Sequence, residues 1–341
     1  MQGSPDIEAA AFVLDEVVGY LVPAALRAAA VTGVADHLRN GPRPVAELAA
    51  ATGATEAGLH RVLRLLATRG IFTEAAPGVF ALTPPAAALT TDAPHPVRAA
   101  VLMMTDPAMW RSAGEVAEST LDGKPAFDRI FGAPLFDHYA RNPEAVAAFN
   151  DGMAQYSGLE NDPVAAACTV PPDAHVVDLA GGQGGLLCAV LRRHPTATGT
   201  LFDLPHVLPG NVLAADPAVT GRWRLEPGDF RTEVPPADVY LIKRILHDWD
   251  DDTCVRLLRT CAAAARPGAR ILVIDPVLPE GDTPHQAKAV DLLMMTVMPG
   301  HERTAAQFER LLATAGLRLT RIIDIPAMPV SVLEAVISTT G

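Results

Sequence analysis

A glycine-rich stretch at residues 175–187, HVVDLAGGQGGLL, constrains the fold of this chain more than any other feature. Its first part, with Val176, Val177 and Leu179, is an apolar run typical of a buried strand. Glycines at 181, 182, 184 and 185 then lead into an apolar helix, so a ligand can approach backbone that carries no Cβ. The first N–H groups of that helix can bind an electronegative group. We therefore expect a nucleotide-like ligand at the carboxyl end of a parallel sheet.

The glycine spacing leaves two cofactor classes open. A dinucleotide fingerprint requires Gly-x-Gly-x-x-Gly. Counted from Gly182 the sixth residue is Leu187, and counted from Gly181 the third is Gln183, so the pattern fails in both frames. S-adenosylmethionine (SAM) has no pyrophosphate and needs only open backbone beside its methionine moiety. The turn alone does not decide between the two.

Length and composition set the outer limits. A chain of 341 residues exceeds the usual size of a single core, which predicts two domains. A net charge of −12 argues against nucleic acid as a partner. We expect no membrane segment, because the longest apolar run considered, Leu292–Met298, is far shorter than the roughly 18 residues required, and the acidic N-terminus does not resemble a secretory signal. The four cysteines form no Cys-x-x-Cys pair, which predicts buried free thiols and a cytoplasmic location.

The N-terminal part is predicted to be mostly helical. Residues 8–31 form an apolar helical stretch that we expect to bury against another subunit. Helices at 45–51 and 56–68, the second capped by Thr55, and a hairpin of 71–73 with 79–82 then predict a helix-turn-helix with a wing. DNA binding through 56–68 is one interpretation. The acidic chain and the wing tip at 74–78, which lacks a basic residue, favour packing or dimerisation instead.

Helices at 97–121 and 134–159 follow a proline-rich connector at 84–96, and Pro171-Pro172 marks the entry to the glycine-rich strand. From there strands and helices alternate, which predicts the α/β class. The expected strands are residues 198–202, 223–225, 238–243, 270–274, 317–323 and 332–337, and the expected helices between them include 252–266 and 304–315.

Each predicted parallel strand ends in a polar residue, where ligands of open α/β sheets bind. Asp203 can accept both ribose hydroxyls, or it can cap a helix. Asp229 with Phe230 can contact adenine, or the aspartate can form a turn. Lys243 leaves an apolar strand and needs a partner, for which the cofactor region is the nearest candidate.

His247, in the segment Leu246-His-Asp-Trp-Asp250, is the strongest catalytic candidate. A histidine titrates near neutrality and can take the proton of a hydroxyl group, whereas a phenol ionises only near pH 10. Such a base needs an acidic group on its other ring nitrogen, and Asp275 and Glu302 are both candidates. The alternative is a capping or core histidine.

Five segments taken together, DLAGGQG at 178–184, DLP at 203–205, GDF at 228–230, LHDWD at 246–250 and GHERT at 300–304, resemble the SAM-dependent O-methyltransferases. The similarity is greatest to the plant caffeate-type and bacterial antibiotic-tailoring enzymes and spans nearly the whole chain. It implies a Rossmann-like class I methyltransferase sheet, parallel with one antiparallel strand, at 166–341. It also implies a winged-helix dimerisation domain at 1–100 that forms a homodimer, and a helical connector at 101–165 that contributes to the substrate pocket. Ala180 departs from the family, which has a further glycine there, and we read the change as tolerated.

The resemblance also implies the site. His247 would be the general base, with Asp275 and Glu302 beside it. SAM, leaving as S-adenosylhomocysteine, would be held by Asp178, Gly181, Gly182, Asp203, Leu204, Asp229, Phe230, Lys243, Arg244 and Trp249. Met153, Asp248, Met294 and Met298 would line a pocket for a small aromatic hydroxyl compound, although methionines are often simple core. No metal is implied. A C- or N-methyltransferase, a relative that has lost methyl transfer, and a SAM-sensing DNA-binding regulator remain the alternatives.

Overall fold

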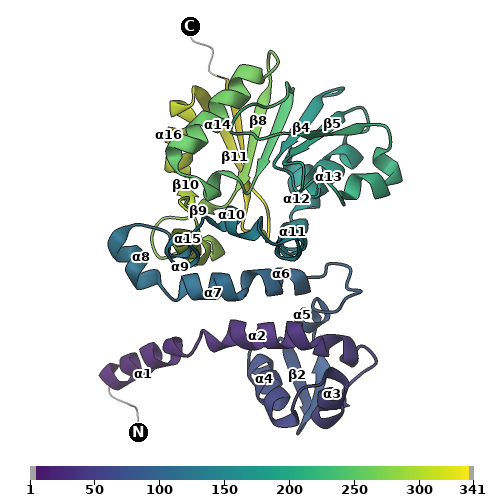
Figure 1. The fold of residues 1–341 in the computed structure, drawn as a ribbon, viewed down its shortest axis with the longest axis vertical. Coiled ribbons are helices and arrows are strands. Elements are labelled where there is room, and N and C mark those ends of the chain that lie inside the picture. The colour runs from purple at the N-terminus through teal and green to yellow at the C-terminus, as the bar shows by residue number, and fades with distance from the viewer. Residues whose placement is uncertain (1–4, 338–341) are drawn as a thin grey trace. The chain divides into compact units, whose positions relative to one another are not determined.

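The protein, described over residues 5–337 by a computed structural model, divides into two compact units (Figure 1). The first comprises Met1–Asp106 with Asp151–Tyr156, and the second comprises Pro107–Asn150 with Ser157–Gly341. The residues of the predicted connector, 101–165, are therefore divided between the two units.

The first unit is mostly helical. Its three-stranded sheet has the order β1-β3-β2, and helices α3 and α4 precede the β2–β3 hairpin, in the order that the sequence predicts. Thr55 caps α4, since its hydroxyl accepts a hydrogen bond from Gly58 N–H at 3.3 Å. The elements are α1 (Pro5–Val17), α2 (Leu21–Thr32), the 3-10 helix η1 (Val34–Leu38), β1 (Arg43–Pro44), α3 (Val45–Thr52), α4 (Glu56–Thr68), β2 (Phe72–Ala76), β3 (Val79–Leu82), α5 (Pro84–Ala87) and α6 (Arg98–Met104).

The N-terminal stretch differs from the prediction in two ways. A turn at residues 18–20 divides the expected single helix into α1 and α2. By length and composition alone, Pro5–Thr32 is also apolar enough to cross a membrane, whereas the expectation of no membrane segment rested on the shorter run Leu292–Met298. No residue of α1 is buried in this chain, and Phe12 and Leu14 are 67% and 69% exposed. This apolar surface lacks a partner among the described residues.

The predicted helices at 97–121 and 134–159 are each divided into shorter ones. Asp106 precedes Pro107, and a residue before proline is disfavoured in a helix. Pro143 likewise opens a new helix behind the cap of Asn142, whose side chain accepts from Glu144 N–H at 2.9 Å. The helices that follow α6 are α7 (Pro107–Ala113), α8 (Val116–Asp122), α9 (Ala126–Phe131), α10 (Leu135–Tyr139), α11 (Pro143–Gly158) and α12 (Asn161–Ala167).

A seven-stranded sheet forms the centre of the second unit, with the order β11-β12-β8-β7-β4-β5-β6. Strand β12 runs antiparallel to both of its neighbours, and the other pairings are parallel. This is the predicted sheet with one antiparallel strand. Its strands are β4 (His175–Leu179), β5 (Thr198–Asp203), β6 (Trp223–Pro227), β7 (Val239–Lys243), β8 (Arg270–Asp275), β11 (Leu317–Asp324) and β12 (Ser331–Ile337).

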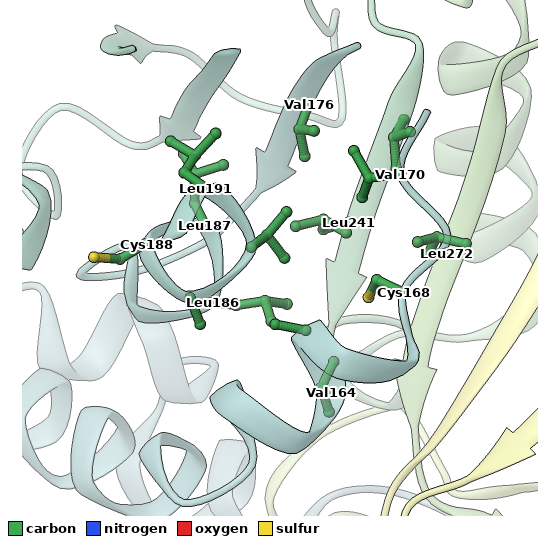
Figure 2. Close-up of a cluster of buried hydrophobic side chains, with 14 of the residues drawn as sticks. Val164, Cys168, Val170, Val176, Leu186, Leu187, Cys188, Leu191, Leu241 and Leu272 are labelled. Atoms are coloured by element: carbon green, nitrogen blue, oxygen red, sulfur yellow. The ribbon is translucent and has the colours of Figure 1, made fainter. Parts of the chain in front are cut away.

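Two apolar layers cover the sheet, because alternate residues of each buried strand point to opposite faces. On one face Val176, Leu241 and Leu272 pack with α12 and with α13 (Gly185–Arg193), as Figure 2 shows. On the other face Val177 and Ile242 pack with α14 (Asp251–Ala264) and α16 (Ala305–Thr314). The four cysteines are free and buried, which confirms that prediction.

Several further elements accompany the sheet, and η4 carries His247 and Asp248. They are the 3-10 helices η2 (Val212–Ala215), η3 (Pro217–Val219) and η4 (Leu246–Asp248), the parallel pair β9 (Val277–Leu278) and β10 (Arg303–Thr304), and helix α15 (Gln286–Val297). The sequence did not predict β9, β10 or α15. Through β9 and β10, the segment that contains Glu302 is joined to the end of β8.

Candidate active site

The turn after β4 is held open by its backbone conformation. Gly182 and Gly184 have φ values of 59° and 77°, and Ala180 adopts a left-handed φ of 50°. A left-handed conformation costs a residue with a Cβ about 1–2 kcal/mol, which is the price of alanine at a position where the family has glycine. A Cβ at Gly181 would lie 2.5 Å from Cγ of Asp178, whereas a Cβ at Gly182 would meet no atom within 4 Å. Packing against Asp178 thus leaves no room for a side chain at Gly181, whereas the space beside Gly182 is open.

Two buried aspartates flank this turn. Asp178 Oδ2 accepts a hydrogen bond from Leu187 N–H at 3.2 Å, and burial raises the pKa of its carboxyl to about 7. Asp203, at the end of the neighbouring strand β5, accepts from Gly182 N–H at 2.8 Å and from Leu204 N–H at 2.7 Å. Burial raises the pKa of Asp203 as well. A carboxylate oxygen has about two acceptor sites, so Asp203 can bind the turn and still accept from a diol. The residues present therefore fit a ribose beside open backbone.

Asp229, Phe230 and Trp249 gather in a second cluster. Arg231 donates hydrogen bonds to both carboxylate oxygens of Asp229, with its Nη2 at 2.7 Å from Oδ2. This contact holds the pKa of Asp229 below its usual value. Phe230 packs edge-on against Trp249 with ring centroids 6.1 Å apart, and Arg231 lies over the same indole. Sequence reasoning did not anticipate that Arg231 would engage the aspartate.

The side chains of Lys243 and Arg244 both contact Glu160, a partner that the sequence did not predict. Lys243 Nζ donates to Ser157 O at 2.7 Å and to Asn161 Oδ1 at 2.8 Å, and it lies 3.3 Å from Oε2 of Glu160. Arg244 Nε donates to the same Oε2 at 3.1 Å. These contacts join both cations to the junction between α11 and α12, and the predicted contact with the cofactor stays a prediction.

Glu160 was missed because nothing in its local sequence links it to Arg244, which is 84 positions away. Its carboxylate is only 3% exposed, yet its pKa is lowered, since the two cations more than offset its burial. An anion that binds two buried cations cannot be removed without leaving uncompensated charge.

His247 lies on η4, directly after β7, with a side chain that is 9% exposed. Its Nδ1 is 2.9 Å from Glu302 Oε1, and its Nε2 is 3.4 Å from Oδ1 of Asp248. Asp275 is fully buried, and neither of its carboxylate oxygens has a hydrogen-bond partner among residues 5–337. Of the two acidic candidates for the histidine, the one in hydrogen-bond contact is therefore Glu302.

His247, Asp248 and Asp275 all have raised pKa values, so each holds its proton to a higher pH than usual. Burial alone would lower the pKa of His247, but Asp248, Glu302 and Asp275 outweigh burial and raise it to about 9. Burial raises the pKa of Asp275 to about 7 and that of Asp248 to about 6. An imidazole whose Nδ1–H is held by a carboxylate presents Nε2 as its acceptor.

The predicted pocket methionines lie in different places. Met294 and Met298 are buried in an apolar cluster of the second unit with Phe127, Leu135 and Tyr139. Met298 also lines an open pocket of about 460 Å³. Met153 belongs to the first unit, so its place in a substrate pocket stays a prediction.

Residues 113–318 match the O-methyltransferase domain, and residues 14–92 match the O-methyltransferase dimerisation domain. The chain belongs to the O-methyltransferase family. It is 38% identical to the phenazine O-methyltransferase PhzM of Lysobacter antibioticus over 325 residues, which cover 95% of each chain. These similarities identify it as a SAM-dependent O-methyltransferase.

Two solved structures extend the comparison. CalO1, a methyltransferase of calicheamicin biosynthesis solved with S-adenosylhomocysteine (SAH), matches with a TM-score of 0.90 and 43% identity, over 98% of this chain and all of CalO1. NcsB1 of neocarzinostatin biosynthesis, solved with SAM and 2-hydroxy-5-methyl naphthoic acid, matches with a TM-score of 0.76 and 34% identity, over 93% and 96% of the two chains. The methyltransferase thus shares its fold with enzymes solved with this cofactor and its product.

Proposed function

We propose that this methyltransferase transfers the methyl group of SAM to a hydroxyl group of a small aromatic metabolite, with His247 as the general base. The observation that carries the proposal is the 2.9 Å contact between His247 Nδ1 and Glu302 Oε1. With its proton on Nδ1, the imidazole has a lone pair on Nε2 that can accept the proton of the acceptor hydroxyl. The aromatic acceptor rests on the relatives, which include a phenazine enzyme and one solved with a naphthoic acid.

Bound SAM supplies an electrophilic methyl group. In our proposal the open turn at Gly181 and Gly182 accommodates its methionine part, Asp203 accepts its ribose hydroxyls, and Leu204, Asp229 and Phe230 lie toward its adenine. Asp178 supports the turn by accepting a hydrogen bond from Leu187 N–H. Holding two reactants in contact is the larger part of such a reaction, and a single proton removal is the rest.

His247 performs that proton removal in the proposal, and the carboxylates around it stabilise the charge that it acquires. Glu302 keeps the imidazole in one orientation and pairs with the imidazolium. Asp275, which is buried and has no hydrogen-bond partner within residues 5–337, adds negative charge once it ionises near pH 7, while Asp248 lies beside Nε2. The scheme invokes no metal, and within residues 5–337 no group of three or more His, Cys, Asp or Glu side chains is arranged so that it could hold a metal ion.

We further propose that the enzyme is a cytoplasmic homodimer. The match to a dimerisation domain and the exposed apolar face of α1 support a partner of the same kind. The alternative, DNA binding through α4, has no support from that match.

The test is incubation with methyl-labelled SAM and a panel of phenols, hydroxynaphthoates, hydroxyphenazines and aromatic amines. We expect labelled methyl ethers from a hydroxylated aromatic. A His247→Ala variant should lose roughly 10²–10⁴-fold in kcat while it binds SAM with unchanged affinity. Transfer only to nitrogen or carbon, or an unchanged rate in the variant, would contradict the proposal.

A further inference from the structure

The segment of residues 300–303 packs directly against the backbone that carries His247. At Gly300 there is no room for a side chain, because a Cβ would lie 2.0 Å from the carbonyl oxygen of His247 and 2.5 Å from the backbone nitrogen of Trp249. Only glycine allows this approach. Glu302, two residues later, contacts the imidazole of His247 itself.

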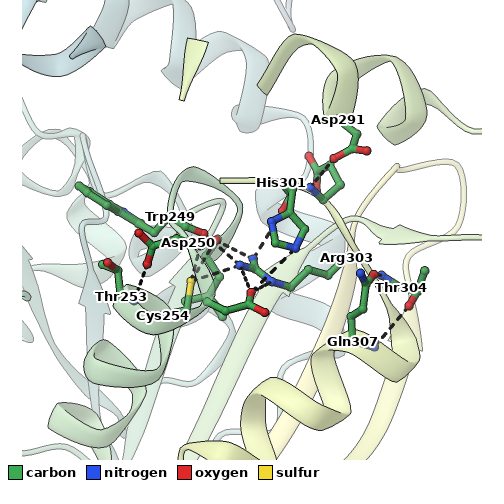
Figure 3. Close-up of polar contacts among 12 residues, drawn as sticks. Trp249, Asp250, Thr253, Cys254, Asp291, His301, Arg303, Thr304 and Gln307 are labelled. Atoms are coloured by element: carbon green, nitrogen blue, oxygen red, sulfur yellow. Dashed lines mark hydrogen bonds and ion pairs between the residues drawn. The ribbon is translucent and has the colours of Figure 1, made fainter. Parts of the chain in front are cut away.

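Arg303 is the next residue, and it is the largest fully buried side chain among the described residues, at 1% exposure. Its Nη1 donates to Leu246 O at 2.8 Å, and its Nη2 donates to Trp249 O at 3.0 Å. Nε and Nη2 both donate to Oδ1 of Asp251, at 3.0 and 2.7 Å. Figure 3 shows Arg303 within this network of polar contacts, near Trp249 and Cys254. The two carbonyls belong to residues on either side of His247, so one guanidinium holds both ends of the loop that presents the base.

The other side of this segment is anchored as well. The backbone N–H of Glu302 donates to Oδ1 of Asp291 on α15 at 2.8 Å. Glu302 is thereby fixed through its backbone by Asp291, while the loop that it faces is fixed by Arg303. The distance between Nδ1 and Oε1 depends on both.

We propose that Arg303 is a positioning residue for the methyl transfer, which holds the η4 loop so that Nδ1 of His247 stays on the carboxylate of Glu302. The proposal rests on the proposed function of His247. Arg303 donates to carbonyls of the η4 loop, to Asp251 and Cys254 at the start of α14, and to His301 O. Its partners within residues 5–337 do not include the imidazole, so we place its effect on His247 in the loop that it holds. The planar fork of arginine is needed for two divergent carbonyls and a carboxylate, which the single ammonium of lysine cannot match.

The experiment compares Arg303→Lys and Arg303→Met with the control Arg222→Met. Arg222 also donates to backbone carbonyls, including Leu191 O and Ala218 O at 2.8 Å each, but those bonds join α13 to the loop before β6. The control therefore removes a similar number of structural hydrogen bonds at a distance from the base. Two measurements are made: the pH dependence of kcat/KM with the phenolic acceptor, and the titration of His247 by NMR in the protein without ligand, assigned by its loss in His247→Ala.

We expect kcat to fall by about tenfold in Arg303→Lys and more in Arg303→Met, with an unchanged dissociation constant for SAM, and to change by less than about threefold in Arg222→Met. Asp248, Asp275 and Glu302 are the charged groups that face His247. When the contact with Glu302 loosens, the pKa of His247 should fall by about one unit, the equivalent of one charge-assisted hydrogen bond. The acid limb of kcat/KM should move to lower pH by a similar amount.

An Arg303 variant that matches Arg222→Met in activity and in the titration of His247 would overturn the inference. Should Arg303→Met fail to fold, Arg303→Lys keeps the charge and decides the question. The two claims fail separately: full activity in His247→Ala refutes the proposed function, whereas a wild-type profile in Arg303→Lys, with an inactive His247→Ala, refutes only the role of Arg303.

Discussion

Replacing Glu302 by glutamine preserves the shape of the side chain and tests whether its charge sets the proton position on His247. Oε1 of Glu302 accepts from Nδ1, while Oε2 is buried without a hydrogen-bond partner among the described residues. An amide NH₂ at the place of Oε2 would be a buried unpaired donor, which costs about 1–3 kcal/mol. The amide therefore gains by turning over and donating to Nδ1, and the ring proton then moves to Nε2. That tautomer cannot accept the proton of the acceptor hydroxyl.

The expected loss is thus most of the general-base contribution, roughly 10²–10⁴-fold in kcat. The assay is methyl transfer under saturating SAM, with SAM binding measured separately by calorimetry, which should not change. Glu226→Gln is the matched control, because Glu226 pairs with Arg224 on the surface of the sheet and should leave kcat intact. If Glu302→Gln retains kcat within about threefold of the parent, the orientation argument is refuted.

Three further changes test other parts of the structure. Asp275→Asn should flatten the pH dependence of stability. The folded protein keeps a proton on Asp275 up to about pH 7, while the unfolded chain loses it near pH 3.8, so the stability of the parent falls as the pH rises through that window. If the variant and the parent show the same difference in Tm between pH 5 and 8.5, Asp275 does not contribute in this way. Glu160→Gln leaves Lys243 and Arg244 buried without their anion and should lower the free energy of unfolding in urea by about 3–5 kcal/mol. A loss below about 1 kcal/mol would show that water solvates these two cations. Phe12→Asp places a charge on the exposed face of α1 and should convert a dimer to a monomer in sedimentation, whereas an unchanged mass would place the interface elsewhere.

The sequence predicts best where one local signal is strong. Helix α4 begins and ends at the predicted residues, and β4 was correctly placed by its apolar run and the glycines behind it. The polar strand ends led to Asp203 and His247 because parallel strands bring their carboxyl ends to one edge of a sheet.

The sequence fails where long-range contacts decide the outcome. It offered both Asp275 and Glu302 as partners of His247, and only the pairing of β9 with β10 brings Glu302 to the imidazole. It offered the cofactor region as the partner that buried Lys243 needs, and it missed Glu160, which lies 3.3 Å from Lys243 Nζ. The roles of Arg303 and Gly300 also leave no local signal, since each acts on backbone more than 45 positions away.

The most direct test of the account is the pH dependence of single-turnover methyl transfer to a phenol, in the wild type and in His247→Ala. We predict that the wild-type rate rises with pH through the pKa of His247, about 9, and levels off about one unit below the phenol's own pKa of about 10. In the variant the rate should follow the ionised fraction of the phenol, so that the gap between the two proteins closes as the pH approaches 10. Identical profiles in the two proteins would show that His247 does not remove the acceptor proton.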